Sequence, residues 1–169
     1  MTDTDRTLLR KQQASALAGI SDVSDPKGVV GEAHQIVLTF DKTADDAMAS
    51  TATTEVGTGM YLPVKAKLVG AYLLLTGSTT LTGHASNYAT VLIDKYTSAG
   101  AGNANLISFA TSTATTDDLA VYTPHSILGD AVAAQLVCDA GTNFSIAITK
   151  AGSGVVVPAL KVILVFEAE

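Results

Sequence analysis

Charged side chains are scarce in this sequence. They make up 15% of its 169 residues, well below the roughly 25% of an ordinary soluble domain. A surface poor in charge is poorly suited to a free monomer, because low surface charge favours association. Two interpretations follow: a stable secreted or viral β-domain with a threonine-rich face, or a protein whose surface is largely covered by neighbouring subunits. The low charge favours the second.

Positively charged residues are scarcer than negatively charged ones. The chain has 10 Lys and Arg against 16 Asp and Glu, which gives a formal net charge of −6. Nucleic-acid binding requires a basic patch. The basic residues are scattered, apart from the neighbours Arg10 and Lys11. We therefore predict that nucleic acid is not a partner.

Cysteine and long apolar runs are also nearly absent. The single cysteine, Cys138, excludes an intramolecular disulfide and lies in the apolar run 131–138, so we predict a small buried hydrophobic residue. No stretch approaches the 18 apolar residues of a membrane-spanning helix, so no membrane partner is expected. The first residues, MTDTDRTLLRK, lack the charge order of a signal peptide.

The clearest pattern that is present lies in residues 143–166. Residues 143–150, NFSIAITK, alternate apolar with small or polar side chains, as a half-buried strand does. The glycine-rich residues 151–154 predict a hairpin loop. Residues 160–166 are apolar on both faces, which is typical of a strand buried on both sides or at an interface. One core between two sheets is predicted to contain Phe144, Ile146, Ile148, Val162, Leu164 and Phe166.

Further strand signals occur at short spacings separated by turns. They cover residues 34–41, 61–76, 88–96, 106–111, 119–124 and 131–139. The range 61–76 is expected to break into two strands near Pro63 or Gly70. Residues 43–59 are polar and rich in Ala, Thr and Gly, which predicts a loop, and a helix is plausible only at the N-terminus and near Ala131. About eight strands in this arrangement predict an all-β fold, most consistent with a jelly-roll β-sandwich.

Residues 1–33 differ from the sandwich domain expected at 34–169, and we interpret them as an N-terminal arm that contains a short helix or is extended. Such a helix is too short to be stable alone in water. We expect the arm to dock on another chain. Its predicted interaction residues are the apolar anchors Leu8, Leu9 and Leu17 and the basic pair Arg10 and Lys11.

The histidines give no sign of a catalytic or metal site. His34, His84 and His125 are far apart, and none has a metal-ligand spacing to another His, Cys or Asp. A β-sandwich hydrolase or a cupin-like enzyme would require a histidine cluster inside a barrel. We predict that the protein is not an enzyme, because no catalytic arrangement can be defended from the spacing.

The paired carboxylates and the glycine-rich loop have simpler interpretations. Asp45-Asp46 and Asp117-Asp118 lie in predicted loops without the turn-forming pattern of a calcium site. Residues 152–154, GSG, precede a strand, so the helix terminus of a phosphate loop is missing. We therefore predict no metal and no cofactor.

Residues 60–166 contain, in order, the segments LPVKAKLVGAYL, NYATVLIDKY, ANLISFATS, DLAVYTPHSI and NFSIAITKAGSGVVVPALKVILVFE. In composition and order they resemble the jelly-roll capsid decoration proteins of tailed bacteriophages, also called cement or head auxiliary proteins. The resemblance implies a structural virion protein, made in the host cytoplasm, that binds the outer surface of the capsid as a homotrimer and stabilises the lattice of the major capsid protein. It implies no catalytic residue.

One alternative is a carbohydrate- or receptor-binding β-sandwich domain of a virion fibre or a lectin. Such a domain would require exposed aromatic residues and a cluster of loop carboxylates. Aromatic residues make up only 5% of the chain and tryptophan is absent, which argues against this alternative.

Overall fold

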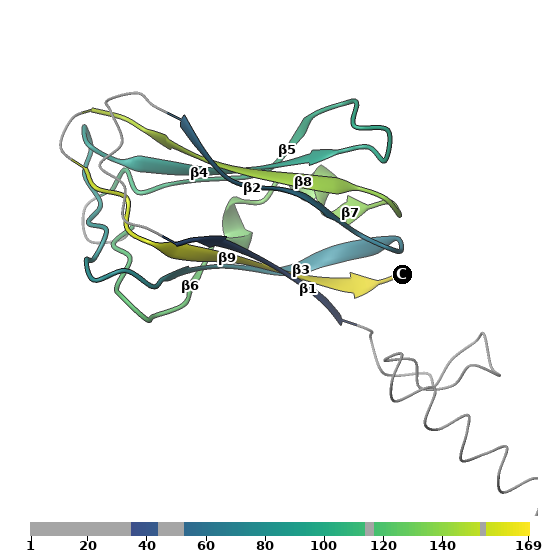
Figure 1. Ribbon diagram of the computed structural model, residues 1–169, viewed down its shortest axis with the longest axis horizontal. Helices are drawn as coiled ribbons and strands as arrows, with labels where there is room; N and C mark the ends of the chain where they lie inside the picture. The colour runs from purple at the N-terminus through teal and green to yellow at the C-terminus, as the bar shows by residue number, and fades with distance from the viewer. Residues whose placement is uncertain (1–34, 44–52, 114–116, 153–154) are drawn as a thin grey trace, which may run out of the picture. The chain divides into compact units, whose positions relative to one another are not determined.

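A computed structural model describes residues 35–43, 53–113, 117–152 and 155–169. Their contacts divide the chain into two units, Met1–Gln35 and Ile36–Glu169, and all described residues except Gln35 belong to the second. This unit consists of two antiparallel sheets that pack face to face (Figure 1). No helix in the part of the chain that the structure describes has the length and apolar character needed to cross a membrane.

The first sheet contains five strands, of which β9 and β3 are central. Its strand order is β1 (Gln35–Lys42), β9 (Leu160–Ala168), β3 (Ala66–Leu75) and β6 (His125–Ser126), and β7 (Val137–Cys138) also pairs with β3. The register of β9 on β3 runs from Leu75 opposite Leu160 to Ala66 opposite Ala168. The ladder covers nearly the whole length of both strands, with one irregularity between Leu68 and Gly70, as suits two strands with apolar side chains on both faces.

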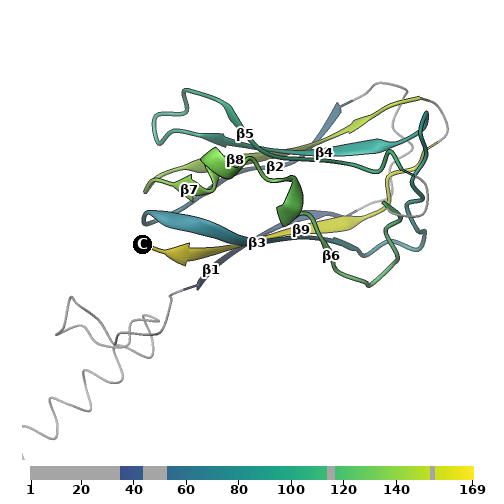
Figure 2. The ribbon, with the colours of Figure 1, turned by 180° about the vertical axis from the view of Figure 1, so that it is seen from behind.

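The second sheet contains four strands. Its order is β2 (Thr53–Tyr61), β8 (Asn143–Lys150), β4 (Ala89–Tyr96) and β5 (Ala104–Ala110). Strands β1 to β4 lie alternately in the first and the second sheet, and the chain crosses again before β6, β8 and β9. This order is that of a jelly roll, and Figure 2 shows the same two layers from behind. The predicted all-β jelly roll is therefore confirmed.

The hairpin predicted for residues 143–166 is wrong. Strands β8 and β9 belong to opposite sheets, so the chain crosses between the layers after β8 instead of turning back within one sheet. Gly152 allows this crossing, because it has φ +68° and a side chain there would overlap Ser86 and Asn87. A glycine-rich segment between two apolar strands indicates a turn but does not say which sheet the second strand joins.

The loop predicted for residues 43–59 is wrong from Thr53 onward, where β2 begins. This edge strand pairs with β8 from Thr53 opposite Thr149 to Tyr61 opposite Asn143, with two irregularities in register. Its glycines and small polar residues are typical of loops, and only pairing with β8 makes them a strand. The chain then leaves β2, and residues 62–65 separate it from β3. This break lies at Pro63, the first of the two positions predicted for it.

The strands predicted at residues 119–124 and 131–139 are much shorter than expected. Residues 119–124 form only isolated bridges, and the segment before β7 contains the short 3₁₀ helix Ala133–Gln135, which follows another at Leu128–Asp130. Within the two predicted ranges only β7 is an ordered strand, and β6 begins just after the first range, at His125. Apolar content in these segments reflects packing against the core, which an irregular segment also provides.

The core lies between the two sheets and contains all six residues predicted for it. Each is at most 1% exposed: Phe144, Ile146 and Ile148 from β8, and Val162, Leu164 and Phe166 from β9. The rings of Phe144 and Phe166 meet across the layers with their centroids 5.3 Å apart. The alternation along β8 and β9 therefore predicted the inward faces correctly.

Cys138 is a buried residue of this core, as predicted, with 1% of its surface exposed. Burial raises the pKa of its thiol above the ordinary value, and the nearby charge of Lys95 lowers it by less. Because the thiolate is the reactive form, a thiol reagent at pH 8 should modify native protein far more slowly than protein unfolded in denaturant. Equal rates in the two states would contradict the burial of this side chain.

Candidate functional site

The outer face of the first sheet is apolar along its centre. We call this surface the apolar sheet face, and it consists of Val37 on β1, Tyr72 and Leu74 on β3, and Ile163 and Val165 on β9. Val37 is 54% exposed and Tyr72 is 37% exposed, and the other three are half-buried. Each alternates along its strand with side chains of the core, so the whole set points away from the second sheet.

Strand register places these side chains next to one another. Tyr72 lies opposite Ile163, and Gly70 lies opposite Val165. A side chain at Gly70 would come within 3.0 Å of the Tyr72 ring and 3.2 Å of the Val165 Cβ. The ring of Tyr72 therefore occupies the space beside glycine and joins Val165 in one continuous apolar surface.

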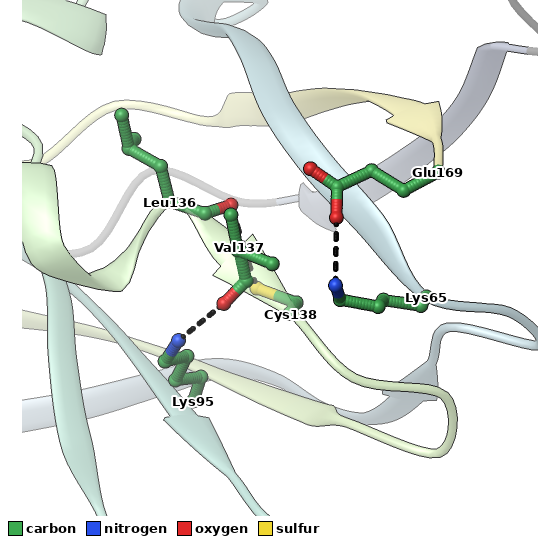
Figure 3. A network of polar contacts seen from close by, with 6 residues as sticks. All are labelled: Lys65, Lys95, Leu136, Val137, Cys138 and Glu169. Atoms are coloured by element: carbon green, nitrogen blue, oxygen red, sulfur yellow. Dashed lines mark hydrogen bonds and ion pairs between the residues drawn. The ribbon is translucent and has the colours of Figure 1, made fainter.

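Charged residues surround the apolar sheet face rather than interrupt it. Lys161 forms an ion pair with Asp41 at 3.1 Å, and both side chains are partly exposed. At the other end of the sheet, Lys65 forms an ion pair with Glu169 at 3.0 Å (Figure 3). The hydrogen bond with Glu169, and then its charge, raise the pKa of Lys65. Exposed pairs of this kind contribute little to stability. They are relevant here because they place charged side chains around the edge of the apolar sheet face.

The outer face of the second sheet has a different character. Strands β4 and β8 place Thr90 opposite Thr149 and Leu92 opposite Ala147 on this face. Thr90, Thr149 and Ala147 are short, and Leu92 is the larger apolar side chain among them. We call this surface the threonine-rich face. The two outer faces thus differ, and the first is the better candidate for an apolar contact, because apolar burial is the main favourable term in association.

The interaction residues predicted from the sequence, Leu8, Leu9, Arg10, Lys11 and Leu17, lie outside the described residues, so the arm remains a prediction. Sequence reasoning did find part of the apolar sheet face. The two-sided apolar run 160–166 predicted either burial on both sides or an interface, and β9 indeed contributes Ile163 and Val165 to the outer surface. The contribution of Tyr72 and Val37 was missed.

The two described histidines have separate structural roles. Nδ1 of His84 accepts hydrogen bonds from the backbone N–H groups of Ser86 and Asn87, each at 3.0 Å. The ring of His125 packs against Phe109 with the centroids 5.1 Å apart. The structure does not bring these histidines into one site. His34 lies outside the described residues.

The described carboxylate pair also has a structural role. Asp118 accepts a hydrogen bond from the N–H group of Gly83, and Asp117 accepts one from the N–H group of Thr113, each at 2.7 Å. Both side chains therefore hold loops together. Across residues 35–43, 53–113, 117–152 and 155–169, no group of three His, Cys, Asp or Glu side chains is placed to hold a metal ion.

No model of a known protein family matches the sequence, and no curated protein matches it. Solved structures that the chain resembles include two of infectious bursal disease virus. The structure of its Gx strain is 13% identical with a TM-score of 0.43, and the VP2 subviral particle is 14% identical with a TM-score of 0.44. The alignments cover 85% of this chain but only 35% and 36% of those chains. The assignment of the jelly roll rests on the strand order described above.

Proposed function

We propose that this chain is a structural virion protein without enzymatic activity, which attaches to the outer surface of a tailed-phage head as a homotrimeric decoration protein. Its partners would be the major capsid protein and two further copies of itself. The observation that carries the proposal is the apolar sheet face on a jelly roll whose sequence is poor in charge. The similarity in composition and segment order to phage decoration proteins supports the same assignment.

The apolar sheet face is the proposed contact between subunits. Fully burying one Val, Leu, Ile or Phe side chain contributes roughly 1.5–3 kcal/mol. Ile163, Val165 and Leu74 are half-buried in the single chain, and Val37 and Tyr72 are more exposed. Covering these side chains would therefore add apolar burial that one chain alone does not achieve.

A trimer requires each subunit to use this face against a different surface of the next one. Such a heterologous contact closes into a ring when the rotation between subunits is one third of a turn. In this proposal the threonine-rich face lies outside the subunit contact. A trimer that attaches to the shell through all three subunits also gains affinity without any new type of contact, because the second and third attachments are intramolecular.

The arm, residues 1–33, is the second proposed contact. Its leucines would bury apolar surface on a sister subunit or on the capsid, and Arg10 and Lys11 would meet acidic groups at the edge of that surface. Ordering such a segment costs conformational entropy, which only docking can offset.

Deleting residues 1–33 tests the arm. The sandwich should stay folded with a little-changed melting temperature, because the core described above lies entirely within residues 36–169. Trimer cohesion or capsid attachment should weaken severely, as measured by co-sedimentation of truncated and full-length protein with undecorated phage shells. If the truncated protein attaches as tightly and keeps its oligomeric state, the arm is a passive tail.

A further inference from the structure

A polar pocket lies at one end of the sandwich, away from the apolar sheet face. Its volume is about 300 Å³, and its walls come from the end of β4, the following turn of residues 97–103, and the segments on either side of β7. The residues that matter for its chemistry are Lys95, Thr97, Ser98 and Asp139. This volume is at the lower end of the range for small-molecule sites.

The walls of the pocket are held in place by the protein itself. Nζ of Lys95 donates a hydrogen bond to the carbonyl of Val137 at 2.9 Å (Figure 3) and another to the carbonyl of Gln135 at 2.8 Å. These bonds tie β4 to the segment around β7. Gly141 has φ +81°, and a side chain there would lie 2.7 Å from the Cβ of Ser98. The two turns that flank the pocket therefore touch, and they do so only because residue 141 is glycine.

The pocket presents donors and acceptors close together. The Lys95 ammonium has three N–H donors, of which two bond to the carbonyls above, so one is left for a ligand. The side chain of Asp139 is exposed and forms no hydrogen bond or ion pair within the described part of the chain. Thr97 donates its hydroxyl proton to the carbonyl of Ala101 at 2.7 Å and keeps its oxygen as an acceptor.

This set of groups selects against two classes of ligand. An anion would meet the unpaired carboxylate of Asp139 and an ammonium already shared between two carbonyls, in a protein of net charge −6. A purely apolar ligand would leave Asp139 and the third Lys95 donor without partners, which is costly when water is displaced.

We propose that this pocket binds a neutral hexose, such as the terminal sugar of a glycan. Adjacent hydroxyl groups of a sugar donate to one carboxylate and accept from an ammonium or a hydroxyl, which is the combination that Asp139, Lys95 and Ser98 offer. The proposal does not depend on the proposed virion function, and it would give the protein a contact with a glycan-bearing surface.

The test is a titration of the ¹⁵N-labelled full-length protein with methyl glycosides of neutral hexoses and, separately, with sialic acid as an acidic sugar. At least one neutral hexose should shift the amide signals of Thr97, Ser98 and Ala140 in a saturable way. Asp139→Asn should weaken this binding by about tenfold or more, because a charge-assisted hydrogen bond becomes a neutral one. Asp130→Asn is the matched control, since it removes an equal charge from an exposed carboxylate that does not line the pocket, and it should change nothing.

Three results would overturn the proposal: no saturable shift with any neutral hexose, saturable binding of sialic acid alone, or equal binding by Asp139→Asn and the unaltered protein. Ser98→Ala is a second variant that removes one hydroxyl and keeps the Cβ that packs against Gly141, and it should also weaken binding. The oligomeric mass of the same variants separates this proposal from the proposed virion function. A variant that loses sugar binding should keep the oligomeric mass of the unaltered protein.

Discussion

Replacing Phe166 by alanine should lower the free energy of unfolding by about 3–5 kcal/mol. Phe166 is fully buried on β9 and packs against Phe144 of β8, so its ring joins the two sheets. Removing the ring loses its apolar burial and leaves a cavity that two hydrogen-bonded sheets cannot fully close. Because a domain is stable by only about 5–15 kcal/mol, this loss should be plain in urea denaturation.

Val165→Ala is the matched control for this prediction. Val165 is the neighbour of Phe166 in the sequence but points to the outer surface, where it is half-buried. Its truncation should cost less than about 1 kcal/mol, since only part of its surface is removed from water. If both variants lost the same stability, or if Val165→Ala lost more, the register of β9 would be wrong, because a slip of one residue exchanges the two faces of a strand.

Replacing Ile163 by aspartate should dissociate the proposed trimer into monomers that remain folded. Ile163 is central on the apolar sheet face, opposite Tyr72. A carboxylate buried there against another subunit would lack a partner, and burying an unpaired charge costs several kcal/mol. In the monomer the same carboxylate faces water, so the fold should tolerate it. Sedimentation velocity gives the oligomeric state, and thermal melting of the same sample reports the fold.

Leu92→Asp is the control for the oligomer prediction. Leu92 is also a half-buried apolar residue in a central strand, but it points outward on the threonine-rich face. The Leu92→Asp substitution introduces the same charge as Ile163→Asp and should leave the trimer intact. Dissociation by Leu92→Asp but not by Ile163→Asp would assign the subunit contact to the opposite sheet and contradict the proposal.

The sequence predicted local structure well where one strand face is buried. The alternation of Phe144, Ile146 and Ile148 identifies both the strand and its inward side, because the period of a strand is two residues. Strand partners were harder to predict. The same pattern is compatible with a hairpin and with a crossing between sheets, because pairing depends on residues far away in the chain, such as the β3 partner of β9.

The same physical reason explains why most of the candidate surfaces were not predicted. The apolar run of β9 signalled a second apolar face, but Tyr72 joins that face only through the pairing of β3 with β9. The pocket depends on Lys95 and Asp139, which are distant in the sequence. They come together because the end of β4 pairs with the start of β8, where Tyr96 lies opposite Asn143. No local pattern marks such a site.

The central claim is that this jelly roll assembles into a trimer that decorates a capsid, and native mass tests it most directly. Mass photometry of the full-length protein, alone at micromolar concentration and after binding to and release from initially undecorated phage shells, should give about three times the 17.3 kDa of one chain. The shells should sediment with the bound protein. A mass of one chain in solution, with no protein sedimenting with the shells, would contradict this claim.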